Sequence, residues 1–216
     1  IGMTILLRIA QDNKLALPAT GLVSANAARG STNQAIVSVA FWFHGQDWAT
    51  DNWVYLGKDT NGSNGWQAPI TTALFPEGDK YTVLAVATDA AGNQDVSVAF
   101  NAIVDRTGPS LSLNPIASPV KTDQVSLSWK AYDSLAGLDH FSLRRKLNYD
   151  DFETLTDSIS GSARSFAASV EMGNVIIYEI IAYDRSGNAT SDKISLYTLG
   201  YEFPLEFIFP MVNGTE

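Results

Sequence analysis

TVLAVATDAAGN at residues 82–93 returns as IYEIIAYDRSGN at residues 177–188. Each stretch is an alternating apolar run that ends in Ala-x-Asp-x-x-Gly-Asn, with its aspartate at Asp89 or Asp184. The two aspartates stand 95 positions apart. Because a β-sandwich domain has roughly 100 residues, a repeat of this period predicts two related antiparallel sandwiches in tandem, an all-β fold.

The composition fits two ordinary domains and argues against several classes of protein. The chain has 216 residues, of which 45% are hydrophobic, so each half can bury a core. The formal net charge is −9, and an acidic surface repels phosphate backbones, so we expect no nucleic-acid partner. No run of about 18 apolar residues occurs, which predicts no membrane span. Cysteine is absent, which disfavours a secreted animal domain.

Strand patterns fill both halves, and nothing beyond a single turn indicates helix. AIVSVAFWF at residues 35–43 alternates, so its valines and phenylalanines, from Val37 to Phe43, are expected to face the core. QVSLSWKAYD at residues 124–133 alternates in the same way, with Leu127 among the inward side chains.

Two stretches of the first half give weaker patterns. Residues 18–34 are rich in Ala, Gly, Ser, Asn and Thr, which indicates turns and short strand edges. Residues 95–103 indicate one strand that closes the first domain.

The sequence DRTGP at residues 105–109 marks the boundary between the halves, because Gly and Pro interrupt regular structure and Pro restrains the residue before it. We therefore predict one sandwich over residues 1–105, a second over residues 109–199 and an apolar tail over residues 200–216. The chain begins at Ile1 without a charged leader, which favours a piece of a longer polypeptide.

Several motifs carry a resemblance to known modules. VSVAFWFHGQDW, WVYLGKDTNGSNGW, LFPEGDKYTVLAVATDAAGN and VDRTGP resemble bacterial extracellular immunoglobulin-like repeats. VSLSWKAYDSLAGLDHFSLRRK and YEIIAYDRSGN resemble the related fibronectin type III-like sandwiches. The ending LEFIFPMVNG is similar to those of secreted proteins of filamentous phototrophic bacteria. The resemblance implies an extracellular or cell-surface module, and it implies no particular activity.

The Asp-x-x-Gly-Asn corners admit two interpretations. In the first they are tight turns, since Asp accepts hydrogen bonds from its own turn while Gly and Asn tolerate positive φ. In the second they belong to a calcium site near the domain joint, to which Asp89 or Asp105 contributes oxygens. The sequence favours the turn, because no Asp-x-Asp-x-Asp-Gly spacing is present.

Trp48 is a candidate for binding carbohydrate. It stands in the loop HGQDWATDN, flanked by acidic residues, where an exposed indole could stack on a sugar ring. The alternative, which we favour, is that Trp48 folds back over the edge of the sandwich, because tryptophan is usually mostly buried.

No catalytic constellation is recognisable. The chain has no cysteine, no Gly-x-Ser-x-Gly elbow, and only two histidines, His44 and His140, which lie in different halves. We therefore expect a non-enzymatic structural or adhesive protein without a resident cofactor, calcium excepted. The alternative is an accessory region, spacer or substrate-binding, of a secreted hydrolase such as a protease or glycosidase.

Both ends of the chain are apolar and β-prone, which is an aggregation hazard unless they are covered. For residues 1–9 we expect pairing within the chain. For the tail, residues 200–216, we expect contact with another subunit or surface component, because Pro204 and Pro210 interrupt strand pairing.

Overall fold

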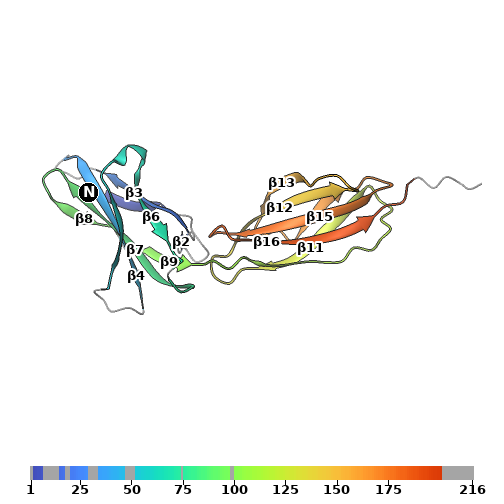
Figure 1. The fold of residues 1–216 in the computed structure, drawn as a ribbon, viewed down its shortest axis with the longest axis horizontal. Coiled ribbons are helices and arrows are strands. Elements are labelled where there is room, and N and C mark those ends of the chain that lie inside the picture. Colours follow the sequence, from blue (N-terminus) through green and yellow to red (C-terminus); the bar gives the residue numbers. More distant parts are fainter. Residues whose placement is uncertain are drawn as a thin grey trace, which may run out of the picture.

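The computed structural model describes residues 2–6, 15–17, 20–28, 34–46, 52–73, 75–97 and 100–200. It contains two β-sandwiches that lie end to end along the long axis of the molecule (Figure 1). Unit 1 comprises the described residues up to 104 and unit 2 comprises residues 110–200. The joint between them is residues 105–109.

Unit 1 packs a three-stranded sheet against a larger one that follows the order β2-β9-β7-β4-β5, with β8 paired to β7. The smaller sheet contains β1 (Gly2–Leu6), β3 (Thr20–Ala28) and β6 (Trp66–Thr71). The larger sheet contains β2 (Leu15–Leu17), β4 (Ile36–Gly45), β5 (Val54–Asp59), β7 (Gly78–Asp89), β8 (Gln94–Val96) and β9 (Phe100–Val104). The described part of the chain has one single-turn 3-10 helix, η2 (Gly62–Asn64).

Strand β4 supplies the centre of the unit 1 core, as its alternation predicts, but not along its whole length. Val39, Phe41 and Phe43 are fully buried, whereas Val37 is 43% exposed. The pairing of β4 with β7 is irregular between Ile36 and Ser38, and this bulge reverses the faces at the start of the strand. The prediction for Val37 was therefore wrong.

Two other expectations for unit 1 need correction. Residues 18–34 contain β3, a nine-residue strand between β1 and β6, whose small side chains such as Ala25 are buried. Residues 95–103 form two strands instead of one. Both strands pair antiparallel with β7, and between them the hydroxyl of Ser97 accepts a hydrogen bond from the amide of Ala85. Strand β1 pairs antiparallel with β3, so residues 2–6 pair within the chain.

Unit 2 has the same plan in a more regular form. One sheet contains β10 (Ser110–Leu113), β11 (Gln124–Tyr132) and β14 (Ser165–Ser169). The other has the order β13-β12-β15-β16, with β12 (Leu138–Leu147), β13 (Glu153–Ser160), β15 (Val175–Asp184) and β16 (Ala189–Tyr197). Trp129 of β11 packs on Phe141 of β12, with ring centroids 5.1 Å apart, and joins the two sheets. Leu127 is fully buried, as its alternation predicts.

A tyrosine anchors the equivalent strand of each unit to the loop before it. The hydroxyl of Tyr81 in β7 donates to the carbonyl of Pro76 at 2.6 Å, and that of Tyr178 in β15 donates to the carbonyl of Ser169 at 2.7 Å. Such a tyrosine corner is typical of immunoglobulin-like sandwiches. Its presence in both units fits the immunoglobulin-like architecture of each sandwich.

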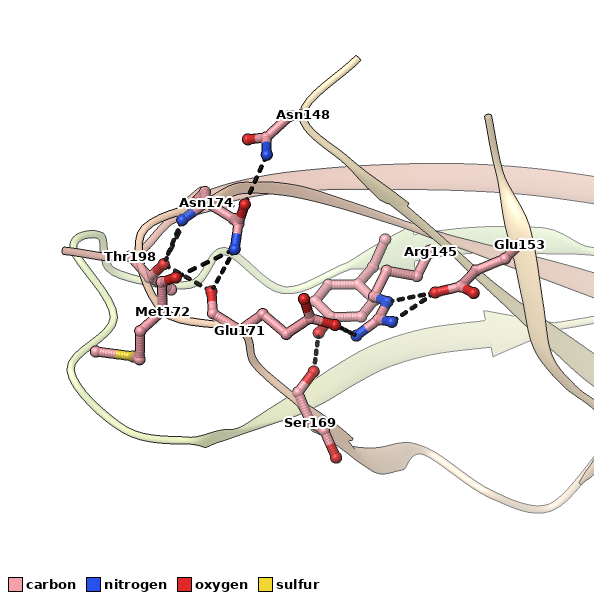
Figure 2. Close-up of polar contacts among 9 residues, drawn as sticks. Arg145, Asn148, Glu153, Ser169, Glu171, Met172, Asn174 and Thr198 are labelled. Atoms are coloured by element: carbon pink, nitrogen blue, oxygen red, sulfur yellow. Dashed lines mark hydrogen bonds and ion pairs between the residues drawn. The ribbon is translucent and has the colours of Figure 1, made fainter. Parts of the chain in front are cut away.

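Polar contacts close the end of unit 2 that lies away from unit 1 (Figure 2). Arg145 of β12 forms ion pairs with Glu153 at 2.5 Å and with Glu171 at 3.1 Å. The hydroxyl of Thr198 donates to the carbonyl of Glu171, and it accepts from the amide of Asn174. These contacts fix the end of β16 against the loop before β15. None of the helices in the described part of the chain is long and apolar enough to cross a membrane.

Candidate metal centre

The joint is tied to unit 1 by its second and third residues. Arg106 donates through Nη1 to the carbonyls of Thr72 and Phe75, both at 2.8 Å. Its amide donates to Glu77 at 2.6 Å, and the hydroxyl of Thr107 donates to the same carboxylate. The chain therefore leaves β9 in a fixed direction.

The joint is also in contact with unit 2. The side-chain amide of Asn188 donates to the carbonyl of Asp105 at 3.1 Å. A Cβ atom added to Gly108 would lie 2.7 Å from the hydroxyl of Thr190, so the backbone runs directly against the start of β16. Leu135 of unit 2 packs on the buried Ala16 and Ile103 of unit 1. The joint, residues 105–109, thus has contacts with both units, and Leu135 adds an apolar contact between the units.

Three carboxylates meet at this joint, from segments far apart in sequence. Asp105 follows β9, Asp133 follows β11 and Asp184 ends β15. One oxygen from each can be chosen so that all lie within 4.8 Å of one another. The three residues are 1%, 7% and 0% exposed, respectively.

Turns hold each carboxylate in place. Asp133 accepts from the amides of Leu135 and Gly137, at 3.2 and 2.6 Å, so it caps its own loop. Asp184 accepts from both the backbone and the side-chain amide of Asn188, at 2.9 and 2.7 Å. Asp105 accepts from the amide of Thr107 in the joint and, at 2.9 Å, from the amide of Ala136 in unit 2. The site is consequently assembled only when the joint docks on unit 2.

The electrostatics of this group are unfavourable without a cation. Within the described residues, no Lys, Arg or His forms an ion pair with any of the three carboxylates. Burial raises the pKa of Asp105, and repulsion from Asp133 and Asp184 adds to this, although hydrogen bonds oppose it. Burial likewise raises the pKa of Asp184. Buried charges of one sign are costly to bring together, so binding a cation would stabilise the group.

The donor set fits a hard divalent cation. Oxygens bound to Ca²⁺ lie about 2.3–2.6 Å from the ion, so two ligand oxygens of one ion can be about 5 Å apart at most. All three oxygens lie within 4.8 Å of one another, so no pair of them exceeds that limit. Three carboxylates leave room for water and carbonyl oxygens in a shell of six to eight, whereas a zinc site would normally include nitrogen or sulfur donors. The chemistry therefore favours calcium.

Asp105 lies in this group and Asp89 does not. Asp89 ends β7, whose first residue, Gly78, pairs with Val104 beside the joint. With a rise of about 3.3 Å per residue, a strand of this length places Asp89 roughly 36 Å away from Gly78, at the opposite end of unit 1. Asp89 accepts from the amides of Ala91 and Asn93 and forms the tight turn of the first interpretation. Trp48 lies outside the described residues.

Asp133 was missed in the sequence, although a signal for it exists. The tripeptide Ala-Tyr-Asp occurs at the C-terminal ends of β11 and β15, where Asp133 follows β11 directly and Asp184 is the last residue of β15. Strands β11 and β15 lie in different sheets of unit 2 and run in the same direction, so Asp133 and Asp184 meet at one end of the sandwich. The shared tripeptide would have pointed to the pair.

Comparison with known proteins supports the fold and goes no further. No family model matches the chain, and no curated protein is similar to it in sequence. Among solved structures, the FN1–FN3 domains of chicken CNTN1 match with a TM-score of 0.51 at 11% identity, covering 85% of this chain and 64% of that one. A tetra-tandem repeat from the extending region of a large adhesion protein matches with a TM-score of 0.36 at 21% identity, covering 89% of this chain and 48% of that one. The chain is thus similar in fold to tandem fibronectin-type domains, and it spans less than two thirds of either protein.

Proposed function

We propose that this chain is a non-enzymatic spacer module of an extracellular protein, in which a calcium ion at Asp105, Asp133 and Asp184 fixes the angle between two sandwiches. The observation that carries the proposal is the meeting at the joint of three buried carboxylates, none of which forms an ion pair within the described part of the chain. Their mutual repulsion loosens the joint in the absence of the ion, and a bound cation reverses that effect.

An extracellular setting supplies the ion that such a site requires. Extracellular calcium modules bind with Kd on the order of 10⁻⁴–10⁻³ M, which suits a calcium-rich medium. A site of this kind is filled outside the cell and stiffens the module only there. Two sandwiches held end to end would then space apart whatever lies on either side of them.

Isothermal titration of calcium into the EDTA-treated, desalted chain tests the proposal. We expect one ion per chain, with stabilisation of about 2.7 kcal/mol when calcium is a hundredfold above Kd. Asp133→Asn keeps an acceptor oxygen for its loop while it removes a negative charge. This variant should lose calcium binding and should be more stable than the wild type when both are free of calcium.

Small-angle scattering gives the corresponding readout of shape. Calcium should narrow the distribution of interdomain angles in the wild type and leave the Asp133→Asn variant unchanged. Equal calcium binding by the wild type and this variant, or scattering that is insensitive to calcium, would contradict the proposal.

A further inference from the structure

A groove crosses the outer face of the large sheet of unit 1, on the side away from the core. It has a volume of about 490 Å³, which is within the range of ligand-binding clefts. Strands β4, β5, β7 and β8 and the residue before β5 supply its lining: Ser38, Ala40, Trp42, Trp53, Lys58, Leu84, Val86, Thr88, Gln94 and Val96. None of these residues belongs to the joint or to the metal centre.

Two tryptophans provide flat apolar surface in this groove. Trp42 lies between the buried Phe41 and Phe43 in sequence, so strand alternation turns its ring to the outer face. Its ring packs on Tyr55 of β5, with centroids 5.0 Å apart. Trp53 packs on His44 of β4 in the same way, at 4.8 Å. Both indoles are thus held in position before any ligand arrives.

The polar part of the lining is neutral except for one lysine. Ser38, Thr88 and Gln94 contribute hydroxyl and amide groups, and Lys58 contributes the single charge. The side-chain amide of Gln94 lies 3.4 Å from the hydroxyl of Thr88, a long contact that a better partner would replace. Among the residues that the structure describes, no carboxylate lines the groove, although the chain has 23 acidic residues.

The interruption between β8 and β9 shapes one wall. Strand β8 pairs with β7 only along Val86 to Thr88. The strand ends before Ser97, whose hydroxyl accepts a hydrogen bond from the amide of Ala85. Gln94 and Val96 therefore stand beside the sheet face as part of the groove. This is the place where the sequence pattern predicted one uninterrupted strand.

We propose that this groove binds a neutral oligosaccharide, with pyranose rings stacked on Trp42 and Trp53. The C–H face of a sugar ring is apolar and packs on an indole, while its hydroxyls pair with the serine, threonine, glutamine and lysine side chains. The net charge of −9 repels polyanionic sugars. An apolar peptide fits less well, because the groove lies on the face of the sheet and its apolar lining is interrupted by hydroxyl and amide side chains.

The test uses the intact chain and a set of neutral oligosaccharides, including β-linked glucan, mannan and galactan hexamers, with a uronate hexamer as the anionic arm. We expect at least one neutral hexamer to bind and to quench tryptophan fluorescence. Trp42→Ala and Trp53→Ala should each weaken binding at least tenfold. Tyr149→Ala, which removes a fully exposed aromatic ring from unit 2, should change nothing.

Two further variants keep the result interpretable. Gln94→Ala removes a polar partner from the exposed rim without touching the core, so it should weaken binding even if a tryptophan variant misfolds. Asp133→Asn should bind sugar as the wild type does, which separates this proposal from the calcium-dependent joint.

Three outcomes would overturn the inference. The first is that none of the neutral hexamers binds. The second is that binding survives in the folded tryptophan variants and in Gln94→Ala. The third is that a synthetic peptide of residues 200–216 binds instead and is lost with Trp42→Ala, which would assign the groove to the chain's own tail in a second copy.

Discussion

Asp89 and Asp184 show how one local motif takes two electrostatic roles. Both end a strand, and both accept from the backbone and side-chain amides of the asparagine four residues later. The hydrogen bond from the Asn93 side chain leads the effects that lower the pKa of Asp89. The pKa of Asp184 is raised, because it is buried beside Asp133 at the joint. The turn is a property of the motif, whereas the charge state depends on the neighbours.

A matched pair of substitutions separates these roles. Asp89→Asn should destabilise unit 1, because an amide then faces the donating side chain of Asn93, and it should leave calcium affinity unchanged. Asp184→Asn should abolish calcium binding. Urea unfolding and calcium titration of both variants check this, and a loss of calcium binding in Asp89→Asn would mean that the site has been misplaced.

The pH dependence of stability follows from the raised pKa values. Asp105 and Asp184 retain protons in the folded chain at a pH where they have lost them in the unfolded chain, so the folded state binds more protons above the ordinary value of 3.8. Without calcium, their contribution should therefore make the chain more stable at pH 5 than at pH 7. The lowered pKa of Asp89 changes stability with pH in the opposite direction. The measurement therefore compares how much the free energy of unfolding changes between pH 7 and pH 5 in the wild type and in Asp133→Asn, which lacks part of the repulsion. If the wild type gains no more stability than the variant when the pH is lowered from 7 to 5, this explanation is contradicted.

The candidate site could be predicted from the sequence only in part, for a physical reason. Asp105 was identifiable as a candidate, because it is an acidic residue at the expected domain joint. Asp133 was not identified, because its partners lie 28 residues upstream and 51 residues downstream, and a sequence motif reports only local spacing. The meeting of these carboxylates depends on how two sheets and a joint pack together.

At the scale of the strands, alternation succeeded where side chains were large and failed where they were small or where the ladder was irregular. Strand β11 follows its pattern through Leu127 and Trp129. Strand β3 did not resemble a strand, because alanine and glycine have low β propensity, yet pairing on both sides fixes it. A bulge at Ile36/Ser38 turned Val37 to the other face, an interruption at Ser97 divided one expected strand into two, and sequence periodicity registers neither feature.

The tyrosine corners make a prediction for the strands that they anchor. Tyr81→Phe and Tyr178→Phe each remove one hydrogen bond to a carbonyl that water can reach, so each should cost about 1 kcal/mol. The two costs should add, because the residues lie in different units. Urea denaturation of the single and double variants measures this, with the fully exposed Tyr149→Phe as a control. Markedly non-additive costs would show that the units do not unfold independently.

At the scale of the whole molecule, the joint is in direct contact with both units. Arg106 binds carbonyls of unit 1, while Asp105 and Asn188 connect the joint to unit 2. A calcium ion held by Asp105 and by the two aspartates of unit 2 would therefore act on the angle between sandwiches instead of on either core. Glycine and proline in the sequence led to the prediction of a boundary at residues 105–109, whereas the proposed dependence of the joint on charge came from the meeting of the three carboxylates.

Gly108 offers a test of that closeness. A Cβ at this position would lie 2.7 Å from the hydroxyl of Thr190 and 2.9 Å from the carbonyl oxygen of Ala189, and the latter belongs to the backbone and cannot easily move. Gly108→Ala should therefore push the joint away from unit 2, weaken calcium binding and broaden the range of interdomain angles. The cores should remain intact, because no core side chain is touched.

Gly200→Ala is the matched control, since its added Cβ would meet only Gly173, at an ordinary contact distance of 3.9 Å. Small-angle scattering and calcium titration of the two variants test this prediction. Urea unfolding checks that the core of each sandwich is as stable as in the wild type. If Gly108→Ala keeps both the calcium affinity and the scattering profile of the wild type, the joint tolerates a shift of its backbone. The carboxylates would then be assembled by unit 2 alone, and the ion would stabilise one sandwich without setting its angle to the other.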